Sequence, residues 1–293
     1  MIYREQFCII GYILDYKLMQ FLSALSLAPA VNDWLANSFH PRILHVFDHV
    51  CNLINERREI LSIVTPQIGN GPFNLVIEDD VLFSDYLHAQ SPISIRANQL
   101  TLGDLTINTD SAKLWSPRPD WEVLHAKRDV ILNQLTSLPI TAYQILLPYS
   151  LISDLSLALA NANLPPSLVA AKKLAGLGQG LTPAGDDFIL GAVLAAWIIH
   201  PPEVASVIAE EITNVVAPLT TSLSAAWLRS AGRGEAGVLW HNFFDALLDP
   251  ISDLQAPTDK ILSVGETSGA DALAGFFGVM SAFKERIIDE CPS

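Results

Sequence analysis

One stretch decides the fold of the C-terminal part of the chain: residues 176–199 have the sequence GLGQGLTPAGDDFILGAVLAAWII. Its first twelve positions hold four glycines and end in two aspartates, and residues 188–199 are apolar apart from one glycine. This apolar run is well short of the roughly 20 residues that span a bilayer. We therefore expect residues 188–199 to form a helix buried in a protein core.

The glycine-rich segment before this helix is suited to binding a small anion. Glycine permits positive φ angles and lets a ligand approach the backbone closely. The first turn of a helix presents unpaired N–H groups and the positive end of the helix dipole, which suit a phosphate or carboxylate. Thr182 is the expected N-cap, with Pro183 as the first helical residue. The candidate ligand-binding residues of this segment are Gly178, Gly180, Thr182 and Gly185.

Asp186 and Asp187 are unexpected at this helix end, because carboxylates repel an anion bound there. They make sense if one of them contacts an NH₂ donor of the ligand or a Mg²⁺ ion. Adjacent helical residues point about 100° apart, so we expect the other to be structural. Both are candidate catalytic residues, and one of them is the metal ligand if magnesium is used. The alternative is a tight turn with an acidic cap and no ligand.

A second polar segment, residues 220–224, has the sequence TTSLS. Thr221 and Ser224 are three residues apart, so a helix places their hydroxyls on one face. Arg229 and Arg233 follow at a spacing of four, which suits a fork onto a carboxylate or phosphate. The alternative is a hydroxyl-rich cap followed by two solvated basic residues. The candidate ligand-binding residues here are Thr220, Thr221 and Ser224.

A third segment, residues 265–271, has the sequence GETSGAD and precedes an apolar helical pattern. Ser268 is a plausible N-cap with Asp271 three residues later, so capping alone explains the segment. The candidate ligand-binding residues here are Thr267, Ser268, Gly269 and Asp271. Because three similar segments lie far apart in the sequence, we expect them to converge and line one cleft.

The fold class predicted by the apolar spacing is α+β, with a β-rich N-terminal part and a mostly helical C-terminal part. Short runs with partial period-two alternation predict strands at 61–64, 73–77, 93–95 and 105–107, in a small antiparallel sheet or barrel. The Pro-rich segment 116–119 separates the expected domains, 1–118 and 119–293. Helical spacing predicts helices at 45–54, 121–138, 151–160, 188–199, 204–216, 222–230, 238–248 and 271–283.

Composition excludes some classes of partner. The formal net charge is −14 and no Lys/Arg-rich run occurs, so neither nucleic acid nor an anionic membrane is an expected partner. A small anionic substrate remains possible, because a few local groups can bind it. The three cysteines form no CxxC pair and leave one over, which is typical of a protein in the reducing cytoplasm.

The three polar segments, in this order and spacing, resemble the AllH-like family, which is linked to oxamate carbamoyltransferase. The matching pieces are 178–188, Thr220-Thr221 with Ser224, and 265–271 with Leu273 and Gly275. The helix predicted over 46–53, Gly71-Pro72 and the strands that follow also fit. The resemblance covers nearly the whole chain and departs from the pattern at 233–235.

The resemblance implies a subunit of a complex in allantoin breakdown that converts oxalurate and phosphate to oxamate and carbamoyl phosphate. It also implies larger partner subunits that are similar to acyl-CoA synthetases. Two other functions stay open: a stand-alone Mg-dependent phosphoryl-transfer enzyme, and a non-catalytic scaffold subunit. The sequence has no P-loop signature for the former.

Overall fold

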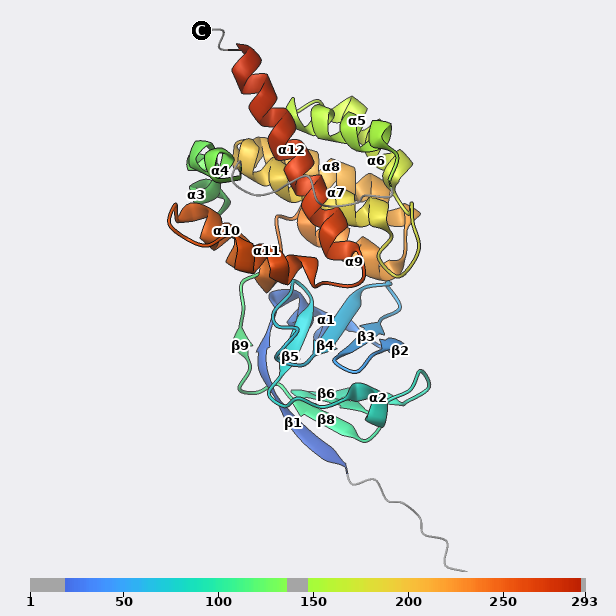
Figure 1. The fold of residues 1–293 in the computed structure, drawn as a ribbon. Coiled ribbons are helices and arrows are strands. Elements are labelled where there is room, and N and C mark those ends of the chain that lie inside the picture. The colour runs from blue at the N-terminus through green and yellow to red at the C-terminus, as the bar shows by residue number, and fades with distance from the viewer. Residues whose placement is uncertain (1–18, 136–146, 291–293) are drawn as a thin grey trace, which may run out of the picture.

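The chain forms a strand-rich N-terminal part and a helical C-terminal part, as the sequence predicts (Figure 1). The computed structural model describes residues 19–135 and 147–290. Its strands lie between residues 20 and 114, and the helical region begins at residue 121. The division into domains 1–118 and 119–293 stays a prediction, and the change of secondary structure occurs at the expected Pro-rich segment.

The N-terminal strands form one curved, nearly closed mixed sheet. Its order is β2-β3-β4-β5-β1-β8-β7-β6, and β9 pairs with β1. Most pairs are antiparallel, whereas β1 pairs in parallel with β8 and β9, and β4 with β5. The strands are β1 (Gln20–Leu27), β2 (Arg42–Val46), β3 (Val50–Ile54), β4 (Ile60–Val64), β5 (Asn74–Ile77), β6 (Ile93–Arg96), β7 (Gln99–Leu102), β8 (Leu105–Asn108) and β9 (Lys113–Leu114).

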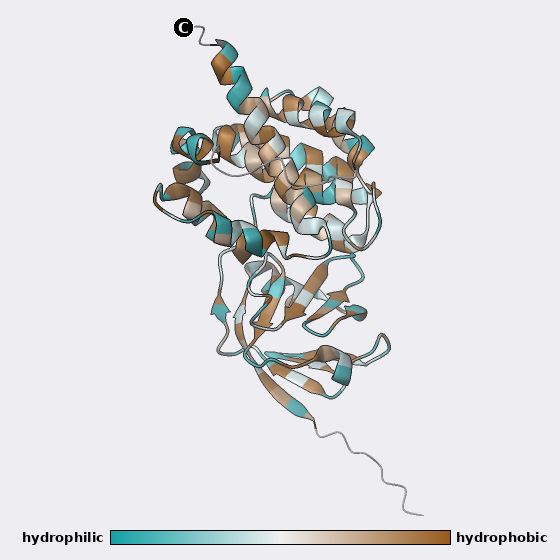
Figure 2. Cartoon of the chain, viewed as in Figure 1, coloured by the Kyte–Doolittle hydropathy of each residue, from teal (hydrophilic) through white to brown (hydrophobic). Residues whose placement is uncertain are grey.

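Alternating side chains give this sheet a hydrophobic interior. Along β1, Leu22 and Ala24 are buried, whereas Phe21 is exposed. Figure 2 shows the resulting alternation of hydrophobic and hydrophilic residues along the strands. Two short helices complete this part: α1 (Pro29–Asn37), which buries Trp34 in the same core, and α2 (Phe83–Tyr86).

The helix predicted over 45–54 is wrong, because these residues form the end of β2, a turn and β3. The Phe47 N–H donates to the Val50 carbonyl at 2.8 Å and closes the turn. Most of β3 is buried, with Cys51 and Leu53 in the sheet core and Ile54 in a second cluster. A strand buried on both faces has a nearly continuous apolar run, which periodicity does not separate from a helix.

The other predicted helices are present, one of them in two pieces. The helix predicted over 121–138 breaks at Lys127, and residues 136–138 lie outside the described ranges. Helices α6 and α11 are not among the predicted helices; the prolines of α6 occupy its first turn, where proline is tolerated. The helices are α3 (Trp121–Ala126), α4 (Arg128–Leu135), α5 (Tyr149–Ala160), α6 (Leu164–Leu174), α7 (Ala184–Ile199), α8 (Pro202–Val216), the 3₁₀ turn η2 (Ala217–Leu219), α9 (Ser222–Gly232), α10 (Val238–Leu248), α11 (Gln255–Leu262) and α12 (Ser268–Glu290).

The apolar helix α7 is the centre of the helical core, and α12 crosses it closely (Figure 1). A Cβ on Gly191 would lie 1.7 Å from the Ala272 carbonyl oxygen, and one on Gly275 would lie 2.0 Å from the Phe188 carbonyl oxygen. Only glycine permits this backbone approach. Within the described ranges, no helix has the length and apolarity needed to cross a membrane.

The sheet meets the helical part along α9. Ile60 and Phe73 of the sheet side pack with Leu223 and Trp227 of α9. The Phe73 and Trp227 rings meet edge to face, with centroids 4.7 Å apart. Helix α9 therefore has one side against the sheet, while its first turn reaches the start of α7.

Candidate functional site

Helix α7 begins one residue later than expected. The Pro183 carbonyl accepts hydrogen bonds from the N–H groups of Asp186 and Asp187 at 2.9 and 3.1 Å, so Pro183 is the N-cap. Thr182 precedes the cap, and its hydroxyl instead lies 2.9 Å from the Ser268 hydroxyl. The prediction of Thr182 as N-cap is therefore wrong. Its side chain links the α7 loop to α12.

The glycine-rich loop folds back onto the end of α6. Gly178 and Gly180 have φ angles of 123° and 92°, which favour glycine. The Gly185 N–H donates to the Leu177 carbonyl at 2.8 Å. A Cβ on Gly185 would lie 2.0 Å from the Leu174 carbonyl oxygen, so this residue allows a close approach to α6. One on Gly180 would contact nothing within 4 Å, so the loop is open at that point.

Asp186 is the centre of a hydrogen-bond cluster that engages both of its carboxylate oxygens. Its side chain is only 1% exposed. One carboxylate oxygen accepts the Gly176 N–H at 2.8 Å, and the other accepts the hydroxyls of Ser224, at 2.8 Å, and Thr220. These donors come from the α7 loop and from the start of α9. Asp186 therefore joins two of the three predicted segments, in the structural role expected for one member of the aspartate pair.

The start of α9 is also fixed by its own hydroxyls. The Thr221 hydroxyl accepts the Ser224 N–H at 3.1 Å as the N-cap and donates to the Leu181 carbonyl at 2.5 Å. The hydroxyls of Thr220, Thr221 and Ser224 are thus all engaged within the protein. Their contact with a ligand stays a prediction.

Asp187 points to the third segment and is not saturated. Asp187 and Asp271 are 8% and 4% exposed, and the Oδ2 atom of each has no hydrogen-bond partner among the described residues. The Asp271 N–H donates to the Thr267 carbonyl at 2.9 Å in the first turn of α12. A buried carboxyl oxygen without a donor is rare and requires an explanation, such as a ligand or a catalytic role.

The carboxyl groups of Asp187 and Asp271 both have pKa values above that of an ordinary aspartate. Burial raises the pKa of Asp187 to about 8; the hydroxyls of Ser268 and Thr182 oppose this rise, and the charges of Asp271 and Asp186 add to it. Burial also raises the pKa of Asp271, against a hydrogen bond from Thr267. Asp187 is therefore largely protonated at neutral pH. This removes much of the repulsion that the sequence predicts between an acid pair and an anion.

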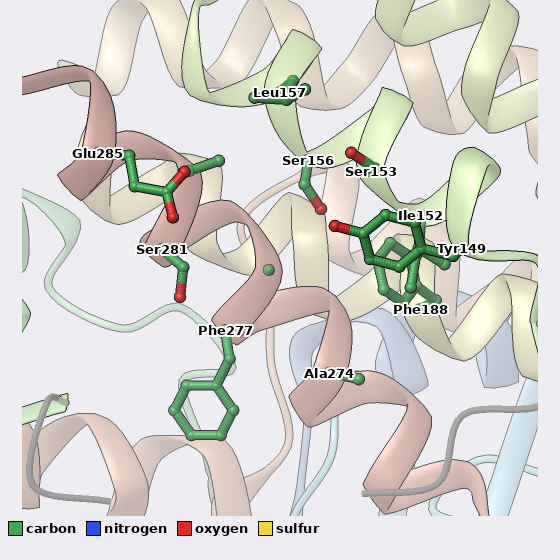
Figure 3. Close-up of a pocket in the computed structure, with 12 residues that line it drawn as sticks. Tyr149, Ile152, Ser153, Ser156, Leu157, Phe188, Ala274, Phe277, Ser281 and Glu285 are labelled. Atoms are coloured by element: carbon green, nitrogen blue, oxygen red, sulfur yellow. The ribbon is translucent and has the colours of Figure 1, made fainter. Parts of the chain in front are cut away.

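The three predicted segments therefore converge, through Asp186 with α9 and through Thr182 with α12. Gly269 lies at the start of α12, where a Cβ would be 1.9 Å from the Ile261 carbonyl oxygen. The structure defines a pocket elsewhere, between α5 and α12, with a volume of about 300 Å³ (Figure 3). Phe188 lines it, but none of the predicted site residues does. That the converged segments line one cleft stays a prediction.

Two family models match the chain. One, described as oxamate carbamoyltransferase subunit AllH, matches residues 174–280, and the other, the AllH family N-terminal domain, matches residues 23–114. Together they cover most of the chain. It belongs to the AllH family. The first match contains all three converging segments of this AllH-family chain. No solved structure matches it.

The two arginines proposed as a fork do not form one in this AllH-family chain. The Arg233 guanidinium binds Glu235 at 2.6 Å and the Ser230 hydroxyl at 3.1 Å, and Arg229 is exposed. Among the described residues, no group of three or more His, Cys, Asp or Glu side chains is placed to hold a metal ion. Since both oxygens of Asp186 are engaged, Asp187 is the member of the pair that has an oxygen free for a ligand.

Sequence reasoning missed the backbone contacts that shape this AllH site. The Gly176 N–H and the Leu181 carbonyl are hydrogen-bond partners of site side chains, and backbone groups carry no residue-specific signal. It also missed the proximity of Asp187 to Asp271. That pairing had a signal: both aspartates lie within the first turn of an apolar helix.

Proposed function

We propose that this chain supplies the substrate site of an oxamate carbamoyltransferase complex, in which oxalurate and phosphate give oxamate and carbamoyl phosphate. The family names a subunit of that enzyme. The observation that carries the proposal is the pair of buried carboxyl oxygens, on Asp187 and Asp271, that have no donor within the described protein. The hydroxyls of Thr182 and Ser268 lie beside Asp187.

This group of side chains suits a carbamoyl compound. A carbamoyl NH₂ offers two N–H donors, which match carboxyl oxygens that lack donors. A protonated carboxyl group can in turn donate to a carbonyl or an anionic oxygen of the ligand. The open backbone at Gly180 and the start of α7 offer room and a positive dipole end for a carboxylate or phosphate. These groups support a site that binds oxalurate and its co-substrate phosphate.

The proposal includes partners, because the family name describes a subunit. We propose that the partners are the acyl-CoA synthetase-like subunits implied by the resemblance. A scaffold role is the competing function. It predicts that the polar residues near Asp187 have no effect on turnover once the complex is assembled.

The test is reconstitution of the complex from the full chain and its partner subunits, with carbamoyl phosphate formation as the assay. Asp271→Asn should raise the KM for oxalurate by roughly 10- to 100-fold, the effect of losing one hydrogen bond to a charged group. The matched control is Asp154→Asn on the exposed side of α5, which removes the same charge outside the three converged segments. If Asp271→Asn matches Asp154→Asn in kcat and KM, the scaffold role is favoured.

A further inference from the structure

We propose that Asp187 and Asp271 hold one proton between them and that Oδ2 of Asp187 delivers this proton to the leaving nitrogen of the substrate. This inference rests on the proposed function and assigns a catalytic acid within that site. It also separates the aspartates of α7 by role: Asp186 as a positioning residue, and Asp187 as a catalytic residue.

The structure buries two carboxyl groups at adjoining helix starts, and the charge of Asp271 opposes the ionisation of Asp187. Asp187 lies in the first turn of α7 and Asp271 in the first turn of α12, and both are more than nine-tenths buried. Two like charges brought close together in a low-dielectric site do not both ionise. The Oδ2 atoms of both groups have no donor within the described residues, so they are free to face a substrate.

Among the residues that the structure describes, no basic group offsets a negative charge on Asp187. The charges that act on Asp187 are those of Asp271 and Asp186, and both oppose its ionisation. Ser268 and Thr182 contribute only neutral hydroxyls. None of the ion pairs found among the described residues involves Asp187. Burial and the neighbouring charges together keep the pKa of Asp187 at about 8, so it retains its proton at neutral pH.

The chemistry needs such a proton donor. A hydrogenphosphate oxygen attacks the carbamoyl carbon of oxalurate, and the bond from that carbon to the bridging nitrogen breaks. The electron pair goes to the nitrogen, which is a poor leaving group unless it is protonated. Asp187 supplies that proton, so oxamate leaves with a neutral NH₂. The proton of hydrogenphosphate then returns to the pair, which balances atoms and charge and leaves carbamoyl phosphate.

Asp186 does not fit the same role. Both of its oxygens accept hydrogen bonds from Gly176, Thr220 and Ser224, so neither is free for a substrate. It holds the loop from which Asp187 extends. Among the described residues of the converged segments, Asp187 and Asp271 are the acids with an unpaired buried oxygen.

The kinetic test uses the assembled complex and two leaving groups. With oxalurate, Asp187→Asn should lower kcat by roughly 10²- to 10⁴-fold, the usual contribution of a general acid, with little change in KM. With p-nitrophenyl carbamate, whose leaving phenolate needs no proton, the same variant should keep most of the wild-type rate. Asp187→Glu should restore part of the oxalurate rate. Equal losses with both carbamoyl donors, or full activity of Asp187→Asn with oxalurate, would overturn the transfer step.

The second test does not depend on the substrate. Carbon-13 NMR of aspartate-labelled full chain should show a carboxyl group that titrates at about pH 8 and disappears in Asp187→Asn. In Asp271→Asn this titration should move to lower pH, because a neighbouring charge is gone. An Asp187 carboxyl that titrates in the ordinary range would overturn the shared proton.

The two tests separate failures of the two proposals. A wild-type complex without oxalurate activity ends the proposed function and the transfer step together, whereas NMR still decides whether the proton is shared. A shared proton with an unchanged kcat in Asp187→Asn leaves the proposed function standing and ends the catalytic assignment. Circular dichroism and co-purification with the partner subunits check that each variant folds and assembles.

Discussion

The two sides of the α7 N-terminus each hold an aspartate carboxyl group, and the two groups differ in their hydrogen bonding. Toward α9, both carboxylate oxygens of Asp186 accept hydrogen bonds, from three donors in all. Toward α12, Asp187 is also buried, yet one of its oxygens has no donor among the described residues. The two residues are adjacent in sequence, so the difference arises entirely from what the neighbouring helices bring to each side.

This difference shows how a buried carboxyl group can be assigned a structural or a functional role. A saturated carboxylate contributes to stability, because removing it leaves its donors unpaired. An unsaturated one costs stability, and proteins tolerate such a cost mainly at functional sites. The same substitution at Asp186 and Asp187 should therefore change stability in opposite directions.

The largest expected effect is a dependence of stability on pH that originates at Asp187. Its folded pKa of about 8 lies above 3.8, the pKa of an ordinary aspartate, so the folded state binds more protons than the unfolded state between these pH values. The free energy of unfolding should therefore fall as pH rises through this window, by on the order of 5 kcal/mol. Urea unfolding of wild type and Asp187→Asn across this range measures the effect.

The comparison of wild type with Asp187→Asn separates the contribution of Asp187 to stability from that of the other titrating groups. Asp187→Asn should gain stability over wild type steadily as pH rises from about 4 to about 8. The exposed-site variant Asp154→Asn should show no such trend. A constant stability difference between Asp187→Asn and wild type at all pH values would mean that Asp187 ionises normally, and the contrast between the two sides would fail.

The next effect is a loss of stability on the α9 side. Asp186→Ala should lower the free energy of unfolding by about 3–5 kcal/mol, because it leaves the hydroxyls of Thr220 and Ser224 and the Gly176 N–H without their acceptor. Chemical denaturation at pH 7 measures it. Asp187→Ala is the matched variant and should not be destabilised to a similar extent. Equal losses of stability in the two variants would show that both aspartates have a structural role.

The smallest effect concerns the cap of α9. Thr221→Ala should cost about 1 kcal/mol, because it removes the acceptor for the Ser224 N–H. Thr221→Ser keeps the hydroxyl and should retain most of the stability. Thermal unfolding of both variants provides the measurement. A loss as large as that of Asp186→Ala would indicate that the hydrogen bond from Thr221 to the Leu181 carbonyl also holds the loop.

Much of the fold was predictable because local patterns and tertiary packing agree. The apolar run after Asp187 forms a buried helix, and the change from strands to helices occurs at the predicted proline-rich segment. The failure at 45–54 has a physical cause: β3 is buried against two clusters, so its apolar spacing matches a helix by coincidence. Helix α6 was not predicted, and its prolines lie in the first turn, where a helix tolerates them.

The meeting of the three segments was predictable, but the contacts that join them were not. Glycine, hydroxyl and acidic residues in three segments indicated convergence, and the hydrogen bonds confirm that the segments meet. Which aspartate is saturated depends on whether α9 or α12 faces it. That depends on the crossing of α7 and α12 at Gly191 and Gly275, which a single sequence does not encode locally.

The position of α9 has a consequence for experiments on the separate parts of the molecule. Its Trp227 ring lies against Phe73 of the sheet, and its Ser224 hydroxyl binds Asp186. A fragment of the helical part alone would expose Leu223 and Trp227 to water and invite aggregation. The fluorescence of Trp227 should respond to separation of the sheet from α9, which makes this side chain a built-in optical probe of that contact.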